Sequence, residues 1–234
     1  MGNYLNPDNS KFQEALNSDI YVDKTGLIRY TNSVLHTLQK NICVSRPRRF
    51  GKSMAANMLT AYYSKGCDSK ELFSNLKIAK DTDFEKYLNK YDTIFLNMQE
   101  FLSMTHSMDE MLTMLQKYLV FDLTDHFQEV RFRDEKNLIQ VMKDVFSYTR
   151  CPFVILIDEW DCLFREYKQD KDAQKKYLDF LRAWLKDKDY VALAYMTGIL
   201  PIKKYGSHSA LNMFTEYSMT DPGDLAEYLS LIHI

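Results

Sequence analysis

The segment Arg46-Pro47-Arg48-Arg49-Phe50-Gly51-Lys52-Ser53 (RPRRFGKS) decides how the rest of the sequence is interpreted. Its last three residues match the end of a phosphate-binding loop, in which a glycine lets the backbone approach the anion and a lysine supplies positive charge. That loop ordinarily has a glycine where Arg46 stands, and half of the segment is cationic. Two interpretations are therefore open: a nucleotide site or a basic turn.

The residues on either side of this segment favour a nucleotide site. Residues 42–44 (ICV) form a short apolar run that is typical of a buried strand. Beyond Gly51, apolar side chains recur at helical spacing at Met54, Met58 and Ala61. The sequence therefore predicts a strand, a loop and a helix in the order that a phosphate-binding loop requires.

Three more strands are predicted, at residues 93–98, 153–157 and 190–196. The run at 153–157 (FVILI) is uninterrupted and is typical of a strand buried on both faces. Strands that alternate with helices of ten residues or more need crossover connections. The predicted fold class is therefore α/β, with a mostly parallel β-sheet flanked by helices on both faces in a three-layer αβα arrangement.

The helices between these strands also have start signals. Ser107 and Glu110 form a capping box ahead of an apolar face that runs to residue 127. Asp134 is expected to cap the next helix. Apolar residues recur again at helical spacing from Ala173 to Trp184 and predict a helix after the third strand.

Polar side chains follow the strands at the ends where a parallel sheet binds ligands. Gly51, Lys52 and Ser53 follow the first predicted strand, Asp158 and Glu159 the third, and Thr197 the fourth. Lys52 would supply charge to the outer phosphates, and Ser53 and Asp158 would hold Mg2+. Glu159 would orient or deprotonate the attacking water. Thr197 is interpreted either as a hydrogen-bonding partner of that water or phosphate, or as a turn residue.

Arg46 departs from the usual loop because arginine does not adopt a positive φ without strain. Pro47 fixes its own φ and favours an extended Arg46, so the loop is expected to enter by a stiffer path. Arg48 and Arg49 are interpreted as phosphate contacts, as a partner surface or as solvated side chains.

Composition narrows the class of protein. The 234 residues are enough for one substantial core, and the net charge of −2 with a pI near 6.2 gives no general attraction for nucleic acid or membrane. The longest apolar run is far shorter than the roughly 20 residues of a membrane span. The four cysteines have no metal-ligand spacing and are expected to be reduced. We expect one domain in a cytoplasmic protein without a membrane partner.

Five motifs together resemble the bacterial AAA-ATPase-like family of P-loop proteins. They are YVDKTGLI (21–28), SRPRRFGKS (45–53), ELFSNLKI (71–78), LIDEWD (156–161) and TGILPIKKYGSHSALNMFTEYSMTDP (197–222). Because the family loop usually reads SRPRRFGKS, the resemblance accounts for Arg46. It implies a P-loop NTPase fold with ATP and Mg2+ as cofactors.

The resemblance also implies roles for individual residues. The Walker A position would comprise the nucleotide-binding residues Arg49, Phe50, Gly51, Lys52, Ser53 and Met54. Asp158 and Glu159 match Walker B, with Ser53 and Asp158 as metal ligands and Glu159 as a catalytic residue. Thr197 matches a sensor-like threonine with a catalytic role. Tyr21, Asp23 and Lys24 match a further motif that by analogy borders the adenine.

Two departures from the family pattern stand out. Trp160 replaces the usual tyrosine of the acidic motif, an exchange that should preserve packing. After Tyr228, family members continue and are often fused to a PD-(D/E)XK nuclease-like domain, which could contact nucleic acid. We therefore expect residues 1–228 to be a P-loop domain truncated at its C-terminal end, and residues 229–234 to be a non-family tail.

The leading functional hypothesis is Mg2+-dependent ATP hydrolysis coupled to a conformational change in a partner or a C-terminal domain. The alternatives are a nucleotide-dependent switch that does not hydrolyse ATP, and a nucleic-acid-binding protein that uses the RPRR patch. The fourth predicted strand is followed by three basic residues, Lys203, Lys204 and His208. They are interpreted either as the source of a phosphate-sensing cation or as a solvated basic turn. A metal-dependent nuclease cluster of Asp158, Glu159 and Asp161 is a minor alternative.

Overall fold

The structure is a computed structural model that describes residues 2–202 and 211–229. In chain order the elements are α1 (Ser10–Leu16), α2 (Gly26–Val34), β1 (Asn41–Ser45), α3 (Lys52–Tyr63), α4 (Lys70–Phe73), η1 (Lys77–Lys80), α5 (Phe84–Tyr87), β2 (Thr93–Asn97), α6 (Met98–Ser103), α7 (Met108–His126), α8 (Leu138–Thr149), β3 (Phe153–Asp158), α9 (Cys162–Glu166), α10 (Lys171–Leu185), β4 (Val191–Gly198), β5 (Thr215–Tyr217), η2 (Gly223–Leu225) and α12 (Ala226–Leu229). The predicted positions Lys203, Lys204 and His208, and the predicted tail beyond Leu229, lie outside the described residues.

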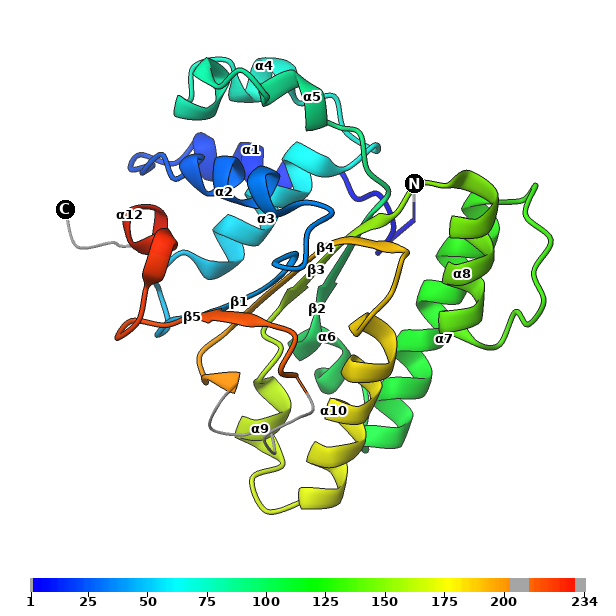
Figure 1. Cartoon of the computed structure of the whole chain (residues 1–234). Helices are drawn as coiled ribbons and strands as arrows, with labels where there is room; N and C mark the ends of the chain where they lie inside the picture. The colour runs from blue at the N-terminus through cyan, green and yellow to red at the C-terminus, as the bar shows by residue number, and fades with distance from the viewer. Residues whose placement is uncertain (1, 203–210, 230–234) are drawn as a thin grey trace.

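The five strands form one sheet in the order β2-β3-β4-β1-β5, and every pairing is parallel. This confirms the predicted α/β class, and the four predicted strands correspond to β1 to β4. The fifth strand, β5, was not predicted, because three residues are too few to show a periodic pattern. It lies beside β1 at one edge of the sheet (Figure 1).

Each face of the sheet is covered by a separate layer of helices. Successive side chains of a strand point to opposite faces, so Val154 and Leu156 pack with the α3 side, and Ile155 and Ile157 pack with the opposite side. Figure 1 shows α1, α2 and α3 on one side of the strands, and α7, α8 and α10 on the other. All of β3 is buried, as predicted. The three-layer arrangement is therefore present.

The helix starts were predicted with mixed success. Ser107 Oγ accepts the backbone N–H of Glu110 at 3.2 Å, which confirms the cap at the start of α7. The predicted Asp134 cap is wrong: Asn137 Oδ1 accepts the N–H of Gln140 at 3.1 Å, and Asp134 instead closes the preceding turn. None of the helices in the described ranges is both long and apolar enough to span a membrane.

The N-terminal segment runs along the outer side of β2. Leu5 forms an antiparallel bridge with Ile94, and the Asn6 N–H donates to Thr93 O at 2.7 Å. The Phe95 N–H donates in turn to Tyr4 O at 3.0 Å. These bonds satisfy backbone groups of β2 that would otherwise face solvent.

Candidate nucleotide-binding site

The predicted site segments meet at the carboxyl ends of three adjacent strands. Strand β4 lies between β1 and β3, so Thr197 is paired with Val44 on one side, and Met196 with Ile157 on the other. Asp158 is the last residue of β3, and the RPRRFGKS loop leaves β1 at the same edge. The sheet topology therefore brings together residues that are far apart in the sequence.

The loop between β1 and α3 has two left-handed residues. Gly51 has a φ of 73° at the N-cap of α3, and Arg49 has a φ of 68°. A side chain at Gly51 would meet no atom within 4 Å, so its positive φ is what favours glycine there. Arg46 is not among the described residues with a positive φ. The missing first glycine is therefore tolerated because the left-handed turn lies three residues later.

Lys52 begins α3 and is buried, with 7% of its surface exposed. Its Nζ donates to Pro47 O at 2.9 Å, which uses one of the three donor positions of an ammonium. Burial lowers the pKa of Lys52, and the nearby carboxylates of Glu159, Asp158 and Asp161 oppose that shift. The ammonium is held at the start of the helix, close to acidic groups, and two of its three donor positions remain for a ligand.

Asp158 is 1% exposed, and its two carboxylate oxygens differ. Oδ1 accepts the Thr197 hydroxyl and, at 3.0 Å, the backbone N–H of Glu159. Oδ2 is buried and has no hydrogen-bond partner among the described residues. An unpaired carboxylate oxygen suits a hard divalent cation such as Mg2+. Ser53 is exposed on the first turn of α3, and its hydroxyl group offers a second oxygen ligand for such a cation.

Glu159 follows Asp158 in a left-handed conformation, with a φ of 55°. Its Oε2 accepts a hydrogen bond from Arg165 Nη2 of α9 in an ion pair that is largely shielded from solvent. Arg165 Nε lies 3.8 Å from Asp161 Oδ2. Sequence reasoning missed Arg165, although its position six residues after Glu159, on the helix that follows the acidic motif, was an available signal. Arg165 fixes where the Glu159 carboxylate lies.

Asp161 has a structural role that the sequence did not reveal. It is fully buried, and Oδ2 accepts the backbone N–H groups of Ile199 and Leu200 at 3.0 and 2.8 Å. The turn after β3 is thereby tied to the segment that follows β4. Trp160 is also fully buried, and its Nε1 would lie 2.6 Å from any Cβ placed on Gly198. The aromatic residue at this position is packed, as expected.

The remaining predicted positions lie around the loop with different exposure. Phe50 and Met54 are half-buried, and Arg48 and Arg49 are exposed. Arg46 is only 3% exposed, so the surface of the RPRR patch is reduced to Pro47, Arg48 and Arg49. This burial removes one of the three charges that a nucleic-acid contact through this patch would use.

The motif at residues 21–28 fixes a turn next to α2. Asp23 Oδ1 accepts the N–H and the hydroxyl of Thr25 at 2.9 and 2.6 Å. Asp23 Oδ2 accepts the N–H of Lys77 at 2.7 Å. Tyr21 packs edge-on against Phe12. These contacts hold Asp23 in a hydrogen-bonded turn in which Lys24 Nζ takes no part. Contact of Tyr21, Asp23 and Lys24 with adenine stays a prediction.

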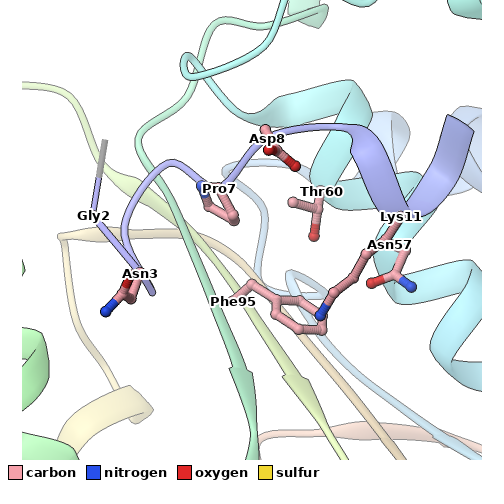
Figure 2. A pocket seen from close by; sticks show the side chains of 8 residues that line it. All are labelled: Gly2, Asn3, Pro7, Asp8, Lys11, Asn57, Thr60 and Phe95. Atoms are coloured by element: carbon pink, nitrogen blue, oxygen red, sulfur yellow. The ribbon is translucent and has the colours of Figure 1, made fainter.

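A pocket lies away from the phosphate loop. It has a volume of about 400 Å³. Its lining residues come from the N-terminal segment, α1, the middle of α3 and β2 (Figure 2). Its charged groups are engaged: Asp8 accepts from Ser10, and Lys11 Nζ lies 5.6 Å from the centre of the Phe95 ring. None of the nucleotide-site residues predicted from the sequence lines it. The size of this cavity therefore does not locate the chemistry.

A parallel sheet with a Gly-Lys-Ser helix start and an acidic strand end two strands away defines the class of P-loop ATPases. The comparisons agree with this class. A family model described as "Predicted AAA-ATPase" matches residues 10–207, and the chain belongs to this AAA-ATPase-like family. No curated protein matches the chain.

The same fold occurs in a solved structure, that of the Aeropyrum pernix ORC1 protein in complex with DNA. The TM-score is 0.51 at 12% sequence identity, and the likeness covers 93% of this chain and 50% of the ORC1 chain. At this identity the likeness shows the fold alone. The chain spans half the length of that ORC1 chain.

Proposed function

We propose that the protein binds ATP with Mg2+ at the edge formed by β1, β4 and β3, and hydrolyses it. The observation that carries this proposal is the buried, unpaired Oδ2 of Asp158, located beside Lys52 at the start of α3. A fully buried carboxylate oxygen without a donor is destabilising unless a cation or a water molecule satisfies it. The family membership independently supports ATP as the nucleotide.

Donor groups and positive charge would bind the phosphates, and oxygen ligands would bind the metal ion. The backbone at Gly51 and the first turn of α3 would bind phosphate oxygens, and Lys52 would neutralise the outer phosphates. Ser53 and Asp158 would hold the metal ion. Mg2+, when bound, neutralises phosphate charge and helps to orient the phosphates. Arg49, Phe50 and Met54 would border the nucleotide from the loop and the helix.

Hydrolysis needs a base close to the outermost phosphate. A water oxygen forms a bond to that phosphorus, the bond to the bridging oxygen breaks, ADP leaves and a water proton passes to Glu159. Glu159 Oε1 makes no hydrogen bond within the part of the chain that the structure describes, so it can accept that proton while Oε2 stays on Arg165. We assign Thr197 a positioning role, because its hydroxyl donates to Asp158.

We further propose that turnover is passed to a partner or a C-terminal domain through the groups that hold Glu159 and Asp161. Arg165 connects Glu159 to α9, and Asp161 connects the same turn to Ile199 and Leu200. A change in the position of Glu159 during the reaction would reach both segments.

The test is phosphate release from ATP by purified protein with and without Mg2+. We expect Glu159→Gln to lower the rate by roughly 100-fold or more, while binding of a fluorescent ATP analogue is retained. Glu166→Gln is the matched control, because Glu166 is exposed and close in sequence. Equal rates for the wild type and Glu159→Gln would remove the proposed base. ATP binding without phosphate release would favour the switch, and no ATP binding would overturn the nucleotide site.

A further inference from the structure

Two basic side chains, those of Arg46 in the phosphate loop and Lys24 before α2, have no acidic partner among the described residues. Arg46 leaves the end of β1 and is 3% exposed. Lys24 precedes α2, and its Nζ is buried. Lys24 and Arg46 lie within each other's electrostatic field. The phosphate chemistry proposed above uses neither of them.

The Arg46 guanidinium is poorly satisfied by the protein. The backbone N–H of Arg46 donates to Gly198 O at 3.0 Å, which fixes the main chain. Among its five side-chain donors, Nη1 reaches Ser45 O only at 3.5 Å, and Nε is buried with no partner among the described residues. An arginine buried to this extent normally has a carboxylate or several carbonyl groups around it.

The Lys24 ammonium also lacks hydrogen-bond acceptors in the described part of the protein. Its Nζ has no hydrogen-bond partner in residues 2–202 or 211–229. The adjacent carboxylate of Asp23 is already engaged by Thr25 and the Lys77 N–H. Burial lowers the pKa of Lys24, and the positive charge of Arg46 lowers it further. The Lys24 ammonium is thus poorly solvated and within range of the positive charge of Arg46.

Another half-buried lysine, Lys40, shows that this condition is local. Lys40 Nζ donates to Lys188 O at 3.1 Å and to Val191 O at 2.8 Å. Lys40 lies just before the start of β1, whereas the phosphate loop follows its end. The protein therefore satisfies a half-buried lysine there and leaves Lys24 Nζ and Arg46 Nε without partners among the described residues.

We propose that Lys24 and Arg46 form a second anion subsite that takes a phosphoryl group. The phosphoryl group has two possible sources: a phosphate of the nucleotide held by Lys52, or a separate small phosphate-bearing molecule. A phosphate dianion matches two adjacent positive charges, and its oxygens accept from both the guanidinium fork and the ammonium. Only the first source rests on the proposed ATP site. The arginine that stands in place of the first loop glycine thereby acquires a binding role.

The test uses the full chain and two probes, inorganic phosphate and Mg-ATP. Thermal unfolding and titration calorimetry would compare the wild type with Arg46→Met, Lys24→Met and Lys52→Met. Arg48→Met is the matched control, since it removes one exposed charge from the same loop. We expect Arg46→Met and Lys24→Met each to weaken binding of at least one probe by about 10- to 100-fold, the effect of one charge-assisted hydrogen bond, with Arg48→Met unchanged.

The pattern across probes identifies the source of the anion. If inorganic phosphate stabilises the wild type and Lys52→Met but not Arg46→Met or Lys24→Met, the subsite takes a separate phosphate. If only Mg-ATP binding weakens in these two variants, the phosphate belongs to the nucleotide. If both variants bind both probes as Arg48→Met does, the subsite is refuted. Should Arg46→Met not fold, Lys24→Met decides. A wild type that binds phosphate through Lys24 but does not bind ATP would refute the ATP site alone.

Discussion

Helix α3 begins at Lys52 beside the phosphate loop and ends at Tyr63 among buried aromatic side chains. At the far end the polar groups form a closed set. Tyr63 Oη donates to Asn32 Oδ1 at 2.7 Å, Asn32 Nδ2 donates to Tyr62 Oη at 3.0 Å, and Tyr62 Oη donates to Phe84 O at 2.7 Å. Each of these buried groups has a partner inside the protein.

At the near end of α3, beside the phosphate loop, several buried polar atoms have no such partner. Asp158 Oδ2, Arg46 Nε, Lys24 Nζ and Tyr195 Oη are buried without partners among the described residues. Buried polar groups in folded proteins are normally paired, so a concentration of unpaired ones indicates groups that a ligand completes. One end of the helix therefore helps to hold the fold together, while the other end is arranged for binding.

The two ends of α3 also differ in the residue types that adopt a left-handed backbone conformation. Near the far end of α3 the left-handed residues are of types that tolerate a positive φ, among them Asn89, whose Nδ2 donates to Ala61 O and Ser64 O. At the near end the left-handed residues include Arg49 and Glu159, for which this conformation is less favourable. Backbone strain therefore accompanies the unpaired polar groups at the site.

The largest expected effect is that of Asp158→Asn. The amide keeps an acceptor for Thr197 and the Glu159 N–H but removes the charge that would hold Mg2+. Because a catalytic metal ion stabilises the transition state by several kcal/mol, phosphate release should fall at least ~100-fold. A Mg2+ titration of turnover measures this. Asp161→Asn is the control and should lower stability instead. An unchanged Mg2+ dependence in Asp158→Asn would contradict the division between the two ends of α3.

At the closed end, Asn32→Leu should affect stability but not binding. The substitution removes the acceptor of Tyr63 and a donor to Tyr62 in a buried network. We expect the free energy of unfolding to fall by about 2–3 kcal/mol, measured by urea denaturation. Affinity for the nucleotide should stay as in the wild type. Ser33→Ala, at an exposed neighbour, should change stability by less than about 0.5 kcal/mol. A clear loss of affinity in Asn32→Leu would mean that the two ends are coupled.

Thr197→Val tests how Asp158 is positioned. Removal of the hydroxyl deprives Asp158 Oδ1 of a donor without changing the side-chain shape much. Turnover should fall about 10-fold, equivalent to ~1.4 kcal/mol of barrier, through loss of metal-ligand positioning. Thr197→Ser keeps the hydroxyl and should restore most of the rate. If serine and valine behave alike in a steady-state assay, the hydrogen bond has no role.

The smallest expected effect concerns the strain in the loop. Arg49→Gly relieves a left-handed arginine and should raise the free energy of unfolding by about 1 kcal/mol. Arg48→Gly removes the same charge at an adjacent exposed position without a positive φ and should lower stability slightly. Thermal unfolding of the two variants in parallel gives the comparison. The same sign of change in both would show that charge, not backbone strain, dominates at this loop.

The fold could be predicted from the sequence because the patterns that indicate its strands and helices lie in contiguous residues. The apolar run that became β3 and the Gly-Lys-Ser helix start are contiguous, and Ser107 lies three residues from its capping partner. The four long strands and the parallel class followed from such signals. Strand β5 escaped because three residues carry no period.

The parts of the site that sequence reasoning missed depend on contacts between distant segments. The burial of Arg46 depends on β4 lying next to β1, where Gly198 O accepts the Arg46 N–H. The same holds for Asp161, whose partners are Ile199 and Leu200. Residue type indicated the chemistry of Asp158 and Lys52, but the partners that each side chain has, or lacks, are a property of the tertiary structure.

The pairing of residues 4–6 along β2 has a consequence for aggregation. An uncovered strand edge is a template on which another chain can add a strand and start a polymer. Here Tyr4 O and the Asn6 N–H already use the neighbouring groups of Phe95 and Thr93. A copy of the protein therefore cannot extend the sheet at these positions without first displacing its own N-terminal segment. This short segment therefore blocks the addition of a strand at the β2 edge of the sheet.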